Sequence, residues 1–177
     1  MLESIALTDL AEKVGYRLHQ QQAIVSTAES CTGGLLASTI IEVAGSSQWF
    51  DRGFITYSNQ AKIDELGVKV ISLQHYGAVS EKVAEEMALG VLYTLRQQPH
   101  YLEDITCYAI STTGVAGPSG GTAEKPVGMV CFSFVKKDSQ GIRTLKTSTQ
   151  YFNGSRSAIR QQAVKFALWT LLELIEE

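Results

Sequence analysis

The sequence predicts an α/β protein: a three-layer α/β/α sandwich around a mostly parallel or mixed central sheet. Short apolar runs alternate with longer segments in which apolar residues recur every three or four positions, as in strands that alternate with helices. The two strongest predicted strands, 105–112 and 127–135, are almost continuously apolar, which is typical of strands covered on both faces. The later strands follow one another without an intervening helix, which favours a mixed sheet.

The first half of the chain alternates helix and strand. The predicted elements are a helix at 8–20, a strand at 23–28, a helix at 32–44, a strand at 54–57 and a helix at 60–66. In the first helix, Leu10, Val14 and Leu18 lie four apart and form an apolar face. We expect Thr8 and Asn59 to cap the helices that follow them.

The second half contains the longest predicted elements. They are a helix at 80–98, strands at 105–112, 127–135 and 144–152, and a closing helix at 155–176. Ser80 is a suitable N-cap for the first of them. With 177 residues, the chain has the length of one ordinary domain, so we treat 1–177 as a single domain.

The composition excludes several classes of function. The net charge of −3 and the pI of about 5.7 argue against a protein that binds duplex nucleic acid. No apolar run is long enough to span a membrane, and the first residues do not resemble a signal peptide, so we expect a cytoplasmic protein. The three cysteines have no metal-binding spacing, so we predict neither a disulfide framework nor a metal site.

A serine follows the first predicted strand in a glycine-rich turn. In folds of this class, ligands bind beyond the carboxyl ends of strands, which here selects the segments 29–34, 56–62 and 113–121. Ser30 lies in the first of them, where the start of a helix offers free N–H groups that can stabilise an oxyanion. This is the arrangement of a serine nucleophile, and the alternative is an ordinary helix cap.

The second segment contains a lysine that can activate the serine. A serine hydroxyl needs a base, and none of the three histidines lies in a candidate turn. Lys62 follows the second predicted strand by one helical turn, and burial would lower its pKa. Tyr57 can relay or orient the proton. The alternatives are a solvated lysine and a tyrosine at the edge of the core.

The third segment is a glycine-rich loop that can hold an anion. Four glycines and a proline lie within 114–121, and Lys125 adds a cation. Such a loop exposes backbone N–H groups that can bind a phosphate or carboxylate, although it can also be a plain connection between strands. Arg156 and Arg160 lie at the start of the last helix, where arginine opposes the helix dipole. An anion bound at that end would explain their presence, and the alternative is a solvated helix start.

Together these segments resemble the CinA C-terminal domain family, whose stand-alone members are nicotinamide-nucleotide amidases. The final R-x-x-x-R at Arg156 and Arg160 also fits the family. The other matching runs are TAESCTGG at 27–34, GSSxWFxRGFxTYSNxAK at 45–62, GAVSE at 77–81 and GVAGPxGGxxxKPVG at 114–128.

The resemblance implies the deamidation of nicotinamide mononucleotide to nicotinic acid mononucleotide and ammonia. The family's serine, tyrosine and lysine fall on Ser30, Tyr57 and Lys62, with serine as nucleophile and lysine as base. No metal or organic cofactor is implied, and the partner is a small mononucleotide. The residues that we expect to bind it are Thr32, Gly33, Gly34, Thr113, Gly114, Gly117, Gly120, Gly121, Lys125 and Arg156.

Several alternatives remain open. Ser119 and Ser155 stand where family members often carry other residues, an aspartate at the second, so the chain can be a nucleotide-binding module with weak or no catalysis. A short-chain-dehydrogenase-like enzyme is disfavoured because Tyr57 and Lys62 are five apart and no GxGxxG is present. Cys31 is an alternative nucleophile. We expect a homo-oligomer, with a dimer favoured.

Overall fold

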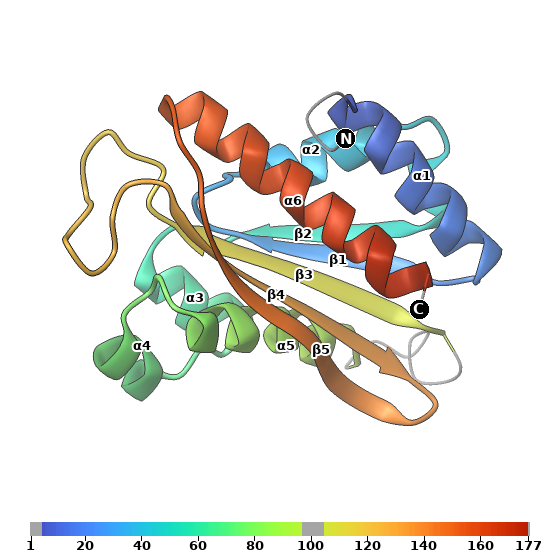
Figure 1. Ribbon diagram of the computed structural model, residues 1–177. Helices are drawn as coiled ribbons and strands as arrows, with labels where there is room; N and C mark the ends of the chain where they lie inside the picture. The colour runs from blue at the N-terminus through green and yellow to red at the C-terminus, as the bar shows by residue number, and fades with distance from the viewer. Residues whose placement is uncertain (1–4, 97–104, 177) are drawn as a thin grey trace.

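The computed structural model describes residues 5–96 and 105–176, and it has helices on both faces of one five-stranded sheet (Figure 1). The elements, in chain order, are α1 (Leu7–Gln20), β1 (Ile24–Glu29), α2 (Leu35–Ile41), the 3₁₀ turn η2 (Ser46–Gln48), β2 (Phe50–Ile55), α3 (Asn59–Leu66), α4 (Val70–Tyr76), α5 (Glu81–Arg96), β3 (Cys107–Gly114), β4 (Met129–Asp138), β5 (Gly141–Tyr151) and α6 (Arg156–Glu176).

The sheet is mixed, as the sequence predicts. Its strand order is β2-β1-β3-β4-β5. β1 runs parallel to β2 and β3, whereas β4 is antiparallel to β3 and β5. Helices α1, α2 and α6 cover one face, and α3, α4 and α5 cover the other (Figure 1). The three-layer α/β/α prediction is therefore confirmed.

The sheet separates two apolar cores, because successive side chains of a strand point to opposite faces. On the face of α1, α2 and α6, the core includes the fully or almost fully buried Leu10, Leu36, Phe132, Phe134 and Ile159. On the face of α5 it includes Val83, Met87, Val91, Leu95 and Val135. In the described residues, no helix combines the length and apolarity that crossing a bilayer requires.

The starts of three helices differ from the prediction. Ala6, not Thr8, precedes α1, so Thr8 lies inside the helix. Ser58, not Asn59, caps α3, because its Oγ accepts a hydrogen bond from the N–H of Ala61 at 3.0 Å. The predicted helix at 32–44 is shorter and begins at Leu35, because the chain first turns through two glycines with positive φ.

Helix α4 was not predicted, and it contains His75. The start of this helix is stabilised by a residue from α5. The buried carboxylate of Glu86 accepts hydrogen bonds from the N–H of Lys69 at 3.0 Å and the hydroxyl of Ser72 at 2.7 Å. A cap supplied across the fold leaves no signal in the local sequence, which explains the omission.

The parallel strands end at the same edge of the sheet, and their connections define the site. β1 leads into the turn before α2, β2 leads into α3, and β3 leads into the loop at 115–128. β2 begins at Phe50, earlier than predicted, and it ends at Ile55, so Tyr57 lies beyond its end. Figure 1 shows the yellow loop after β3 projecting beyond this edge of the sheet.

Candidate active site

Ser30 lies directly after β1 in a tightly turned segment. Its N–H donates to the carbonyl of Thr112 on β3 at 2.9 Å, which continues the sheet by one residue. Its own carbonyl accepts the N–H of Gly33 at 3.1 Å, and the carbonyl of Thr32 accepts the N–H of Leu35 at 3.1 Å. Two consecutive turns therefore carry the chain from the strand into α2, with only 8% of Ser30 exposed.

The carboxylate of Glu29 holds the end of this segment, a role that the sequence did not predict. Glu29 is fully buried, and its oxygens accept the N–H groups of Gly34, Leu36 and Ala37 at 2.9, 3.1 and 2.8 Å. An acid beside a helix N-terminus satisfies free N–H groups and the helix dipole. The only local signal was an acidic residue just before a glycine-rich helix start.

Thr32 is fixed by two other elements of the fold. Its Oγ1 lies 2.7 Å from Oγ1 of Thr112 on β3. Its carbonyl accepts hydrogen bonds from Nε and Nη2 of Arg160 on α6, at 3.2 and 2.6 Å. The segment after Ser30 is thus held by β3, by α6 and by the carboxylate of Glu29.

Lys62 meets Ser30 across the carboxyl ends of β1 and β2. Its Nζ donates to Ser30 Oγ at 3.0 Å, to the carbonyl of Thr56 at 2.7 Å and to the carbonyl of Tyr57 at 3.3 Å. Lys62 lies in the first turn of α3 and is 1% exposed. The sequence predicted that this side chain points back toward the serine, and the geometry agrees.

Burial of Lys62 disfavours its charged form. Burial lowers the pKa of the Lys62 ammonium below its ordinary value, and the nearby Cys31 opposes that shift. Within the described part of the chain, no carboxylate forms an ion pair with Lys62. A neutral amine can donate to the two carbonyls and direct its lone pair at the serine hydroxyl, which is the geometry of a general base.

Tyr57 has a different partner from the one expected. Its side chain is 65% exposed, and its hydroxyl accepts a long hydrogen bond of 3.4 Å from Nη2 of Arg156. Only its backbone carbonyl contacts Lys62. The relay of a proton by Tyr57 stays a prediction, and the structure provides an exposed aromatic side chain whose hydroxyl contacts Arg156.

Cys31 is poorly suited to act as a nucleophile. The residue is buried, and burial raises the pKa of its thiol to about 12. A thiol reacts as the thiolate, so this environment keeps it unreactive near neutral pH. Cys107 and Cys131 are buried as well, as expected for cysteines that pack in the core.

The glycine-rich loop is anchored at a few points. Nη1 of Arg156 donates to the carbonyl of Gly117 at 2.7 Å, and Nζ of Lys125 donates to the carbonyl of Tyr76 at the end of α4. Gly114 is the last residue of β3, where a Cβ would lie 2.5 Å from the carbonyl oxygen of Met129 on β4. This glycine is therefore required by the close approach of two strands.

One predicted binding residue before the loop is buried, whereas three within it lie in a part of the chain shaped by glycines. Thr113 is buried and donates to the carbonyl of Ala78 at 2.8 Å, which ties β3 to the connection before α5. Gly117 and Gly120 have positive φ values of 75° and 87°, and Gly121 lies close to the backbone of Val127. Residues 118–124 are exposed, so this part of the loop is accessible to a ligand.

The cations at this edge of the sheet have backbone carbonyls as partners. The described residues show no ion pair between a carboxylate and any of Lys62, Lys125, Arg156 and Arg160. The buried acid of the turn, Glu29, is already bonded to three N–H groups. Although the chain carries a net charge of −3, these cations are not neutralised by a carboxylate in the described residues, which suits an anionic ligand.

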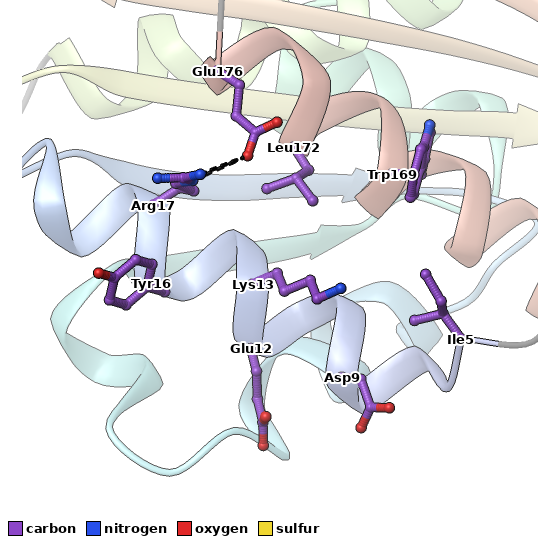
Figure 2. A pocket seen from close by; sticks show the side chains of 9 residues that line it. All are labelled: Ile5, Asp9, Glu12, Lys13, Tyr16, Arg17, Trp169, Leu172 and Glu176. Carbon is purple, nitrogen blue, oxygen red and sulfur yellow. Dashed lines mark hydrogen bonds and ion pairs between the residues drawn. The ribbon is translucent and has the colours of Figure 1, made fainter. Parts of the chain in front are cut away.

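Two further features of the described residues bear on ligands. Over residues 5–96 and 105–176, no three His, Cys, Asp or Glu side chains gather as a group that can hold a metal ion. A groove of about 830 Å³ lies between α1 and α6, and none of the predicted site residues lines it (Figure 2). Lys13, Arg17 and Trp169 are among its lining residues.

Comparison with known sequences identifies close relatives. A family model described as the CinA C-terminal domain matches residues 7–175. The nicotinamide-nucleotide amidohydrolase PncC of Escherichia coli K12 is 48% identical over 165 residues, which are 93% of this chain and 92% of that protein. PncC of Enterobacter agglomerans is 49% identical over 166 residues, 94% of this chain and 93% of its own. A CinA-like protein of Chlorobium limicola is 46% identical over 94% of this chain but only 37% of its own length.

Solved structures share the fold. The competence/damage inducible protein CihA of Agrobacterium tumefaciens superposes with a TM-score of 0.80 at 39% identity, covering 97% of this chain and 96% of its own. A competence-damaged protein (CinA) superfamily protein of Escherichia coli gives a TM-score of 0.82 at 36% identity, with 96% and 90% covered. Sequence and structure therefore lead to the same group of proteins.

Proposed function

The chain belongs to the CinA C-terminal domain family, and on that premise we propose that it hydrolyses the carboxamide of nicotinamide mononucleotide to nicotinic acid mononucleotide and ammonia. The observation that carries the proposal is the 3.0 Å contact between Lys62 Nζ and Ser30 Oγ. It supplies a nucleophile and a base in a chain 48% identical to an amidohydrolase of nicotinamide nucleotides.

In the proposed first step, the neutral amine of Lys62 accepts the proton of the Ser30 hydroxyl as Oγ attacks the carboxamide carbon. The carbonyls of Thr56 and Tyr57 orient the amine, because each accepts one of its N–H groups. Burial supports this role, since it lowers the pKa of Lys62 and increases the share of the neutral form.

The negative charge that develops on the carboxamide oxygen needs donors close to Ser30. The N–H groups of Gly33 and Gly34 already donate to Ser30 and Glu29, so these two are occupied within the turn. In the described residues, the N–H groups of Cys31 and Thr32 donate to no protein oxygen. We assign the oxyanion to these two groups, which are fixed before the substrate arrives.

The reaction is completed by three proton transfers and one water. Lys62 returns the proton to the leaving nitrogen, the C–N bond breaks, and ammonia departs from an ester of Ser30. Water then attacks the ester carbon as Lys62 accepts its proton, and Lys62 passes that proton to Ser30 Oγ as the ester C–O bond breaks, which releases the acid product and restores the hydroxyl. The scheme needs no oxidant and no further reactant, because hydrolysis of an amide consumes only water.

The phosphate of the substrate suits the arginine and lysine side chains at this edge of the site. Arg156 is the principal candidate, since its guanidinium bridges Gly117 and Tyr57 at the mouth of the site. The exposed ring of Tyr57 offers a surface for the pyridine, while Gly120 and Gly121 lie in the accessible part of the loop. Lys125 has a carbonyl partner and is proposed to bind substrate only as part of that loop.

The remaining expectations are proposed on the same basis. Residues 1–177 would act as one cytoplasmic domain, assembled as a homo-oligomer in which a dimer is favoured. An alternative is a nucleotide-binding module without turnover. Ser155 caps α6, because its Oγ accepts a hydrogen bond from the N–H of Ala158 at 3.2 Å. An aspartate at this position would accept the same hydrogen bond. That observation weakens the alternative, because the departure at this position leaves the cap in place.

The experiment is an assay of ammonia release from nicotinamide mononucleotide by the purified protein. We expect turnover by the wild type and a loss of about 10⁴-fold or more in Ser30→Ala, since this change removes the nucleophile. Cys31→Ala is the matched control and should retain most of the activity. Tight binding of the mononucleotide without ammonia release would favour the binding module, and full activity of Ser30→Ala would reject the mechanism.

A further inference from the structure

Arg160 lies one helical turn after Arg156 on α6 but contacts a different part of the site. Its Nε and Nη2 donate to the Thr32 carbonyl at 3.2 and 2.6 Å. Ile159 beside it is 1% exposed and anchors this part of the helix in the core. The guanidinium therefore approaches the turn from a rigid element, and in the described residues no carboxylate forms an ion pair with it.

The contact acts on the residue whose N–H is assigned to the oxyanion. Thr32 is held at its side chain by Thr112, and its carbonyl accepts both the guanidinium and the N–H of Leu35. The next peptide N–H, that of Gly33, closes the turn on the Ser30 carbonyl. The Thr32 carbonyl and the Gly33 N–H belong to one peptide group. Rotation of that carbonyl would therefore disturb the turn that begins at Ser30.

We propose that Arg160 is a positioning residue: by holding the Thr32 carbonyl, it keeps the N–H groups of Cys31 and Thr32 directed at the oxyanion beside Ser30. This rests on the amidase proposed above and deepens it. It replaces a contact between Arg160 and the substrate's phosphate, which its place at a helix start also suggests. The two roles predict different results when the side chain is removed. Loss of a positioning residue affects every amide substrate, whereas loss of a phosphate contact affects only the phosphorylated one.

The test compares Arg160→Ala and Arg160→Lys with the wild type on nicotinamide mononucleotide and on nicotinamide riboside, which lacks the phosphate. We expect kcat of Arg160→Ala to fall by about 100-fold on both amides, with KM little changed, because small displacements at a reacting centre are costly. Arg160→Lys should lose less, since it keeps one charged donor. Added methylguanidinium should restore part of the kcat of Arg160→Ala.

Gln161→Ala is the matched control, because Gln161 is an exposed neighbour on the same helix. A loss confined to KM for the phosphorylated amide would overturn the proposal and make Arg160 a phosphate contact. Unchanged kcat in Arg160→Ala would overturn it as well. Cooperative thermal unfolding of each variant checks the fold, and Arg160→Lys carries the test if Arg160→Ala does not fold.

A second readout separates this proposal from the amidase itself. A fluorophosphonate probe labels an activated serine and places its phosphoryl oxygen in the oxyanion position, so its rate at Ser30 needs no amide substrate. We expect slower labelling in Arg160→Ala than in Gln161→Ala. If the wild type hydrolyses neither amide while this difference persists, the proposed activity fails and the positioning role stands. Equal labelling rates would overturn the positioning role.

Discussion

The turn after β1 and the loop after β3 leave the same edge of the sheet, yet they are held in different ways. In the turn, Ser30 and Thr32 are buried and receive hydrogen bonds from β3 and α6. In the loop, residues 118–124 are exposed, and Arg156 and Lys125 provide its side-chain anchors on neighbouring elements. One region is fixed from several sides, while the other is open to solvent along its tip.

Under the proposed function, this difference separates the residues that carry out the reaction from those that recognise the substrate. A nucleophile, its base and its oxyanion donors must keep their geometry to within a fraction of an ångström, which demands a buried and fully bonded turn. A loop that contacts the distant part of a substrate can tolerate more variation. Helix α6 serves both regions through two arginines one turn apart, Arg156 to the loop and Arg160 to the turn.

The largest effect beyond the nucleophile is expected at Lys62. Lys62→Met should lower kcat by about 1000-fold, because general-base catalysis contributes on that order. In the wild type, activity should rise with pH through the pKa of Lys62, which burial places below 10.5. Steady-state ammonia release across a range of pH measures both, and substantial activity in Lys62→Met would contradict the assignment.

The same residue predicts how stability changes with pH. Between the pKa of folded Lys62 and its ordinary value of 10.5, the unfolded chain holds a proton that the folded chain lacks. The free energy of unfolding of the wild type should therefore rise with pH in that window, relative to Lys62→Met. Urea unfolding of both proteins at several pH values measures the difference, and parallel pH profiles would argue against a buried titrating amine.

A matched pair of glycines compares the two regions directly. Gly34 in the turn has a φ of 89° and Gly120 in the loop has 87°, so alanine is similarly strained at either position, by about 1 kcal/mol. Gly34→Ala adds a Cβ 3.0 Å from Cδ1 of Ile55, whereas at Gly120 the nearest atom is 3.9 Å away. We expect kcat to fall about tenfold or more in Gly34→Ala alone.

Thermal unfolding should show a destabilisation in both glycine variants, which makes it the control for the kinetic comparison. An equal fall in kcat in both variants would contradict the proposed distinction between a rigid catalytic turn and a permissive loop. A fall in kcat confined to Gly120→Ala would indicate that the loop, and not the turn, needs the more exact geometry.

The smallest effect is expected at Arg156, which connects the loop to Tyr57. Arg156→Ala should raise KM for nicotinamide mononucleotide by about tenfold and leave kcat close to that of the wild type, because a charge-assisted contact is worth roughly 1.5 kcal/mol. On nicotinamide riboside the same variant should show a smaller change. Initial-rate kinetics on both substrates measure this difference. An equal change in KM on both would contradict a contact between Arg156 and the phosphate.

The contact between Ser30 and Lys62, the proposed catalytic pair, could be predicted because each residue lies near the end of its strand. Ser30 follows one short apolar run directly and Lys62 follows another by one helical turn, and parallel strands bring such positions together. Arg160 could not be assigned its partner, since Thr32 lies 128 residues earlier in the chain. The cap that Glu29 provides was missed because the sequence did not locate the start of α2 at Leu35.

The sequence by itself determined the alternation of strands and helices, the mixed sheet, the glycine-rich turns and the family, because these depend on residue types and spacings along the chain. Only the tertiary structure decided the pKa shift of Lys62, the partner of the Tyr57 hydroxyl and the start of α4. Desolvation and hydrogen bonding at these places depend on atoms supplied by distant segments, and their positions are defined only when the layers pack together.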